Sequence, residues 1–169
     1  MSNYLRSTRE CLPSQLQPAL LRALQAYFQS HELGDLETES LQCCETVSEK
    51  KAASWLSTWL DTDSPATIYS AIVLTARSLI WVRSADQKDP LVVGADLAFI
   101  NAGLHIAMFT KDVGLQVAGF VGGSNQNIRG VIALGPEPAA LKFCEEVSEA
   151  IKKINPDKGR KWPKWMGGS

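Results

Sequence analysis

Few side chains in this sequence have a type and spacing suited to catalysis. The two histidines, His31 and His105, are far apart, and the acids inside strand-like patterns are Glu45 and Asp96. General acid–base chemistry needs ionisable groups held together in one cleft. No spacing links these four residues, so we expect them to be solvated or hydrogen-bonded side chains. We predict that the protein is not an enzyme.

Phosphate and metal motifs are also incomplete. Residues 122–124 are Gly-Gly-Ser, but no Gly-Lys-Ser/Thr follows, so a hairpin loop is favoured over a phosphate-binding loop. The cysteines, Cys11, Cys43, Cys44 and Cys144, form no Cys-x-x-Cys motif and have no histidine at ligand spacing. Adjacent Cys43 and Cys44 in a strand would point to opposite faces. We expect buried or half-buried free thiols, and no metal or cofactor.

The C-terminal tail combines basic and aromatic residues. Basic side chains near anionic lipid contribute about 1 kcal/mol each, and tryptophans favour headgroup depth. The same composition could stack on single-stranded nucleic acid, which is the less favoured partner. The tail could instead dock on its own domain or be a disordered end. The candidate lipid contacts are Lys158, Arg160, Lys161, Trp162, Lys164 and Trp165.

Composition indicates an ordinary globular protein. The chain has 169 residues, 45% of them hydrophobic and 21% charged, with a net charge of −1. This charge creates no field that would recruit nucleic acid or acidic membrane. No apolar run approaches the roughly 20 residues of a membrane span, and the polar N-terminus lacks the apolar core of a signal peptide. We expect a cytoplasmic protein, with peripheral attachment to a membrane through its tail as the alternative.

Two apolar helical faces are candidate contacts with a partner. A helix should begin near Ser14 and end near Gly34, and its stripe must be buried against this domain or against a second copy. Helical spacing also places Trp55 and Trp59 on one face of residues 52–60, which either folds over the domain as core, the interpretation we favour, or contacts a partner. The stripe of the first helix contains Leu20, Leu24, Tyr27 and Phe28.

Residues 67–84 form the centre of the predicted fold. The alternation of apolar residues and the frequency of β-branched ones predict two strands that fold back near Ala76-Arg77, although a buried helix is the alternative. Pro136 and Glu137 predict the start of a long amphipathic helix that Asn155-Pro156 ends. Further strands are expected at 41–48, 91–100, 104–108, 114–121 and 128–134, with a turn at 101–103.

Successive hairpins followed by one amphipathic helix resemble the bacterial kind of pleckstrin-homology-like (PH-like) domain. The residues that carry the resemblance are IVLTARSLIWV (72–82), GLQVAGFV (114–121), VIALG (131–135) and EPAALKFCEEV (137–147). The resemblance covers roughly residues 40–155. It implies two bent, near-orthogonal sheets with the helix plugging one open corner, and no catalytic residues.

The resemblance also bears on ligands. Relatives that hold inositol phosphates use a basic cluster between the first two strands, where this chain offers only Lys50 and Lys51, beside acidic residues. We therefore do not expect a phosphoinositide site. As a class, bacterial PH-like domains are associated with self-assembly.

These observations predict an α+β fold, a PH-like antiparallel barrel or sandwich of about seven strands capped by a C-terminal helix, with an extra N-terminal helix. The expected units are an N-terminal helical extension at 1–35, the PH-like domain at 36–156 and the basic, tryptophan-containing tail at 157–169. The expected function is protein binding or homo-oligomeric assembly without catalysis. The alternative is a peripheral membrane adaptor that binds anionic lipid through the tail.

Overall fold

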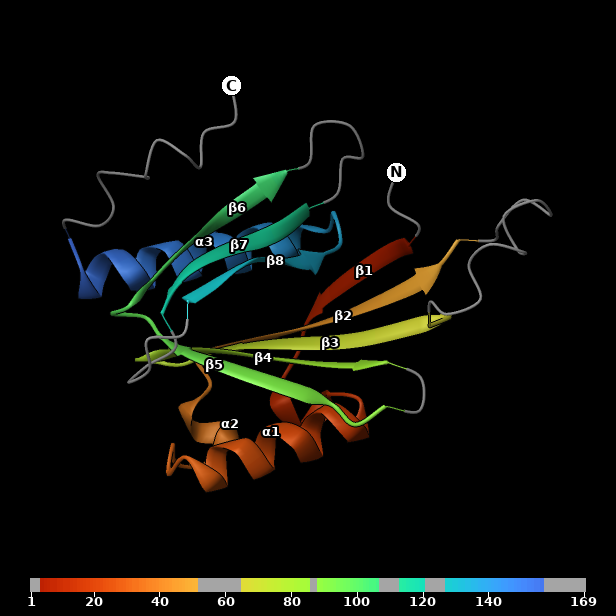
Figure 1. The fold of residues 1–169 in the computed structure, drawn as a ribbon, viewed down its shortest axis with the longest axis horizontal. Helices are drawn as coiled ribbons and strands as arrows, with labels where there is room; N and C mark the ends of the chain where they lie inside the picture. Colours follow the sequence, from red (N-terminus) through yellow and green to blue (C-terminus); the bar gives the residue numbers. More distant parts are fainter. Residues whose placement is uncertain (1–3, 52–64, 86–87, 107–112, 121–126, 157–169) are drawn as a thin grey trace.

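The computed structural model describes residues 4–51, 65–85, 88–106, 113–120 and 127–156. They form an α+β fold with two antiparallel sheets, ordered β1-β2-β3-β4-β5 and β6-β7-β8, and three α-helices (Figure 1). The predicted class is confirmed, but within these ranges the two sheets do not close into a barrel. The elements are β1 (Tyr4–Glu10), a 3-10 turn (Pro13–Gln15), α1 (Pro18–Ser30), α2 (Leu36–Glu39), β2 (Gln42–Lys50), β3 (Thr67–Leu74), β4 (Ser78–Ala85), β5 (Leu91–Asp96), β6 (Ile100–Ile106), β7 (Val113–Phe120), β8 (Asn127–Leu134) and α3 (Pro138–Ile154).

The predicted central hairpin is present as β3 and β4. Its turn uses a threonine in place of an Asn-Gly pair: the Oγ1 atom of Thr75 accepts the backbone N–H groups of Arg77 (3.3 Å) and Ser78 (2.9 Å). A side chain that satisfies the turn's own backbone fixes the reversal without glycine. The alternative of a buried helix in this segment is therefore excluded.

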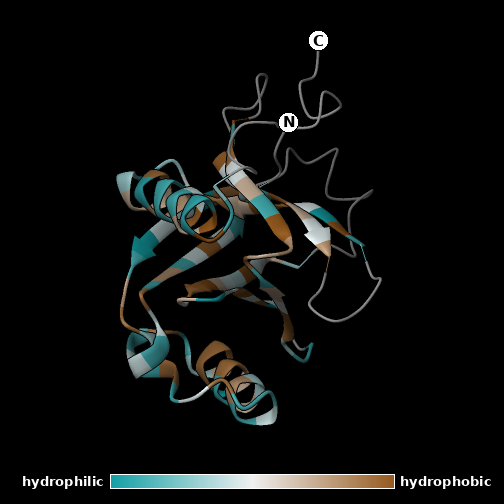
Figure 2. Cartoon of the chain, turned by 90° about the vertical axis from the view of Figure 1, so that its left-hand side faces the viewer, coloured by the Kyte–Doolittle hydropathy of each residue, from teal (hydrophilic) through white to brown (hydrophobic). Residues whose placement is uncertain are grey.

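The central strands β3 and β4 are buried on both faces along much of their length, which explains their nearly continuous apolar sequence. One face, here called the α1 face, contributes Ala71, Val73, Ile80 and Val82 to a core with α1 and α2. The opposite face, here called the inner face, contributes Ile72, Leu74 and Leu79 to a second core with the three-stranded sheet and α3. Figure 2 shows the two helical layers on opposite sides of the sheets.

The C-terminal helix is as predicted, except at its start. Pro138, rather than Pro136, is the first helical residue, and Glu137 is the N-cap. Its stripe is buried, and Asn155 ends the helix, where its side-chain amide donates to the carbonyl of Ala98 (3.0 Å). The buried stripe contains Ala140, Phe143, Cys144, Val147 and Ile151.

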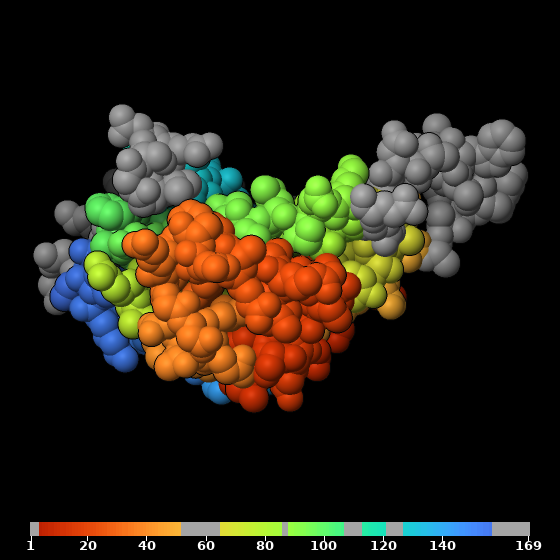
Figure 3. Space-filling view, turned by 90° about the horizontal axis from the view of Figure 1, so that it is seen from below, coloured from red at the N-terminus to blue at the C-terminus, as the bar shows by residue number. Residues whose placement is uncertain are grey.

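The N-terminal helix covers the chain's own sheet (Figure 3). It begins at Pro18 rather than near Ser14, because residues 13–15 form a separate 3-10 turn. Leu20, Leu24 and Phe28 are at most 1% exposed in the core against the α1 face. These three predicted contacts are therefore unavailable to a partner in the folded chain.

Tyr27, the fourth residue of that stripe, is half-buried over β5. A Cβ atom on Gly94 would come within 2.9 Å of the tyrosine Cζ atom, so glycine in this strand lets the ring approach the sheet. This packing belongs to the chain itself.

Two segments differ from the sequence-based expectation. Residues 4–10, which have no clear apolar period, form β1 at the edge of the five-stranded sheet, so the predicted N-terminal extension contributes both a strand and a helix to the same body. Residues 101–103, where a turn was expected, belong to strand β6. The turn lies at residues 97–99 instead. There the Oδ1 atom of Asp96 accepts the N–H of Ala98 (2.8 Å), a side-chain turn that composition does not reveal.

Candidate ligand-binding groove

A cavity of about 410 Å³ lies where the inner face extends past the cover of the three-stranded sheet. Residues from β1, β2, β3, β4 and β5 form its floor, and β8 forms one wall. The floor and wall together comprise Tyr4, Arg6, Ser48, Ile68, Ser70, Trp81, Arg83, Leu91, Val93, Val131, Ile132 and Ala133. We call this the inter-sheet groove.

Strand register brings the floor residues together. One cross-strand row joins Ser70 to Arg83 and Arg83 to Leu91. The next row towards the covered core joins Trp81 to Val93. Directly opposed side chains on one face lie about 4.5–5.5 Å apart at Cβ. The row beside the core is therefore apolar, and the next row outward adds the polar Ser70 and the cationic Arg83 beside the apolar Leu91.

The described lining residues of the inter-sheet groove carry charge of one sign. Arg6 and Arg83 are the charged side chains among its described lining residues, and no carboxylate is among them. Arg83 is exposed and Arg6 is half-buried. Because the chain as a whole is nearly neutral, the exposed positive charge of Arg83 favours an anionic ligand at this end of the groove.

The wall of the groove is an open strand edge. Within the described part of the chain, β8 pairs with β7 on one side and has no strand on the other. Val131 is 47% exposed on this strand. An edge strand presents backbone N–H and C=O groups that another strand can pair with.

Hydrogen bonds fix the closed end of the groove, where β1 meets the end of β8. The Thr8 Oγ1 atom accepts the N–H of Gly135 (2.7 Å) and is 2.8 Å from the Thr46 Oγ1 atom. The Thr8 N–H donates to Glu137 (2.8 Å). A Cβ on Gly135 would lie 2.9 Å from the Thr8 nitrogen, so glycine permits this close approach. The two sheets are thereby held at a defined separation.

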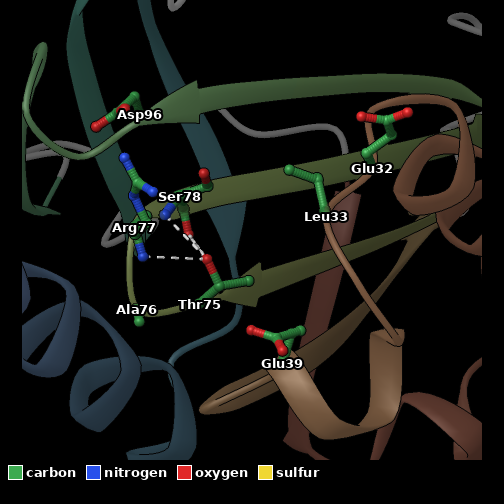
Figure 4. Close-up of a pocket in the computed structure, with 8 residues that line it drawn as sticks. All are labelled: Glu32, Leu33, Glu39, Thr75, Ala76, Arg77, Ser78 and Asp96. Atoms are coloured by element: carbon green, nitrogen blue, oxygen red, sulfur yellow. Dashed lines mark hydrogen bonds between the residues drawn. The ribbon is translucent and has the colours of Figure 1, made fainter.

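A second cavity, of about 300 Å³, lies at the β3–β4 turn (Figure 4). Its charged lining residues are Glu32, Glu39, Asp96 and Arg77. Figure 4 shows the carboxylates on separate elements, without a common focus. Asp96 uses its Oδ1 atom to stabilise the adjacent turn. The arrangement supports a structural role for Asp96.

Glu45 is buried, and its role is structural. Its carboxylate accepts bonds from Arg9 Nε (2.9 Å), Arg9 Nη2 (2.6 Å) and the N–H of Gln17 (2.7 Å). The paired carboxylate raises the pKa of Arg9. Because Gln17 caps α1, Glu45 joins β1, β2 and the start of α1.

The histidines lie apart. His31 stacks on Tyr27 with ring centroids 3.9 Å apart at the exposed end of α1. His105 is half-buried on β6. The described structure does not bring Glu45, Asp96 and the two histidines into one cleft.

The four cysteines have different environments. Burial raises the pKa of Cys44 to about 12 and that of Cys144 to about 11. The Sγ atoms of Cys11 and Cys43 are 4.0 Å apart. Interaction with Cys43 and, to a smaller degree, the charge of Arg9 lower the pKa of Cys11, against the opposing effect of burial. All four thiols are free, as expected.

The remaining predicted site residues lie outside the described residues. They are Trp55 and Trp59, and the tail residues Lys158, Arg160, Lys161, Trp162, Lys164 and Trp165. The lipid and partner contacts assigned to them stay predictions. The groove itself was missed in the sequence, because its residues come from six strands and no local motif marks them.

Comparison with known proteins adds no relative: no protein-family model matches the sequence, and no curated protein matches it. Among the described residues, no helix has the length and apolar character needed to cross a bilayer. No group of three or more His, Cys, Asp or Glu side chains in the same ranges is arranged to hold a metal ion.

Proposed function

We propose that the protein is a non-enzymatic binding module that receives an extended acidic peptide segment in the inter-sheet groove. The observation that carries the proposal is the combination of an open β8 edge with a cationic floor. The peptide would add a strand to β8, and alternate side chains would point into the groove.

Charge selects the peptide class. Arg83 attracts carboxylates, and the arginine fork matches carboxylate geometry in a bidentate pair. Ile68, Trp81 and Val93 provide apolar area for a side chain that alternates with the acidic ones. A basic peptide would place like charge against Arg83, so the groove discriminates against it.

A PH-like architecture is part of this proposal. The described chain between residues 42 and 154 has four strands in one sheet, three in the other and then a helix, the order that the sequence resemblance implies. β1 and α1 are additions to that order. Strand β1 contributes to the proposed binding site, because Tyr4 and Arg6 line the groove.

Selection from a random peptide library tests the function with the full-length chain. We expect enrichment of extended sequences that alternate acidic and apolar residues. Fluorescence anisotropy with an enriched peptide should show affinity that falls as salt rises, because Arg83 is accessible to ions. Enrichment of basic peptides, or of none, would contradict the proposal.

Charge reversal locates the site. Arg83→Glu should weaken binding of the enriched peptide at least tenfold, which corresponds to about 1.4 kcal/mol. Arg22→Glu is the matched control, since Arg22 is exposed on α1, on the opposite side of the sheet. Equal losses in both variants would indicate non-specific attraction rather than binding in the groove. Light scattering of the free protein tests whether a second copy occupies the groove instead, in which case the mass would exceed that of the monomer.

A further inference from the structure

A pair of thiols lies outside the groove, where β1 ends and β2 begins. Cys11 follows the last residue of β1, and its N–H donates to the carbonyl of Cys43 (3.1 Å). The two residues continue the β1–β2 register, in which Glu10 faces Cys44. Cα atoms of a hydrogen-bonded antiparallel pair lie about 5.5 Å apart, which is within the range that disulfides span.

We propose that Cys11 and Cys43 form a reversible dithiol–disulfide site that hydrogen peroxide oxidises. The Sγ atoms are 4.0 Å apart, and a disulfide needs about 2.05 Å. Because the two backbones are already joined by a hydrogen bond in continuation of the strand register, side-chain rotation supplies most of the approach.

The environment assigns a role to each sulfur. Cys11 is half-buried, while Cys43 is 3% exposed. The pKa of Cys11 is lowered, chiefly by the hydrogen bond from Cys43 and then by Arg9, whereas Glu45 opposes this effect. The pKa of Cys43 is raised by the same interaction and by burial. Thiolate character and access determine reactivity, so Cys11 reacts first and Cys43 resolves.

Small molecules can reach the pair. A cavity of about 300 Å³ is lined by Cys11 and Cys43 together with residues of the 3-10 turn and α2. Cys44 and Cys144 are each 1% exposed and have raised pKa values. Cys44 faces the other core, so adjacency in sequence does not make it a competitor for Cys11.

The chemistry balances with one peroxide. The Cys11 thiolate attacks one oxygen, the O–O bond breaks, and the released hydroxide takes up the proton that Cys11 had lost. The resulting sulfenic acid is attacked by the Cys43 sulfur. An S–S bond forms, the S–O bond breaks, and the leaving hydroxide departs as water with the Cys43 proton. Two thiols and one peroxide give one disulfide and two waters, and an external dithiol reverses the oxidation by thiol–disulfide exchange.

Thiol counting and peptide mapping on the full-length chain test this site. The reduced protein has four free thiols. After equimolar peroxide, we expect two thiols in denaturant and a peptide pair linked through Cys11 and Cys43, both reversed by dithiothreitol. Trypsin leaves Cys43 and Cys44 on one peptide. Fragmentation of the linked peptides in the mass spectrometer between these two residues shows which of them is bonded to Cys11. The Cys44→Ala variant is the control, because it should still form the disulfide.

A variant separates the two steps. In Cys43→Ala, oxidation should stop at a Cys11 sulfenic acid that dimedone labels, with no intramolecular disulfide. Mapping of the wild-type protein decides the proposal even if this variant fails to fold. Four titratable thiols after peroxide, or a disulfide between another pair, would overturn it.

Discussion

Glu45 offers a quantitative test of how α1 is held on the sheet. It is 5% exposed, and its carboxylate accepts bonds from the side chain of Arg9 and from the N–H of Gln17. Replacement by alanine removes all of these acceptors. The Arg9 side chain is 57% exposed and can regain water, whereas the half-buried Gln17 N–H cannot regain it fully.

The expected cost follows from these partners. A buried donor left without an acceptor costs about 1–3 kcal/mol, and the partly exposed ion pair adds at most about 1 kcal/mol. Glu45→Ala should therefore lower the free energy of unfolding by about 1–4 kcal/mol. Glu45→Gln keeps a neutral acceptor for Gln17 and should cost about half as much.

Urea denaturation measures both variants. Glu49→Ala is the matched control, because Glu49 is exposed on the same strand and the same face, and it should change stability by less than about 0.5 kcal/mol. Equal stabilities of wild-type protein and Glu45→Ala would refute the account of Glu45 as the residue that joins β1, β2 and α1.

Other predictions concern the α1 face and the thiol pair. Leu24→Ala should lower the free energy of unfolding by about 2–5 kcal/mol, and half-buried Leu21→Ala should cost clearly less; equal costs would contradict the observed packing of α1. The rate at which iodoacetamide modifies Cys11 should reach its pH midpoint below that of an unperturbed thiol, because the pKa of Cys11 is lowered. The Arg9→Gln variant should move this midpoint upward. An unchanged midpoint would exclude an effect of the Arg9 charge. The disulfide between Cys11 and Cys43, 32 positions apart, should raise the free energy of unfolding by about 3–4 kcal/mol, measured by urea denaturation with and without reductant; an oxidised form less stable than the reduced one would indicate strain in the linked strands.

The sequence predicted the elements whose apolar pattern is strong. The stripe of α3 and the β3–β4 hairpin were recognised because both bury a regular face. Strand β1 was not recognised because its sequence has no regular alternation of apolar and polar residues. It is an edge strand, and its Tyr4 and Arg6 line the groove instead of a buried core. The reversal at 97–99 was misplaced because it depends on the side chain of Asp96 and not on glycine or proline.

The groove could not be predicted, because it depends on register between distant strands. Arg6 and Arg83 are far apart in the sequence, and the pairing of β1 through β5 places them on one face. The same holds for Cys11 and Cys43, which differ from the other cysteines only through neighbours in space. Patterns along the sequence identify helices and strands, whereas these two sites depend on how the strands are aligned with one another.

The most direct test of the binding function is amide hydrogen exchange of the full-length chain with and without the enriched acidic peptide. Strand addition to β8 predicts slower exchange at the amides of residues 131–133 that face the groove, with little change in α1. Protection confined to α1, or unchanged exchange in β8 at saturating peptide, would contradict the proposed function.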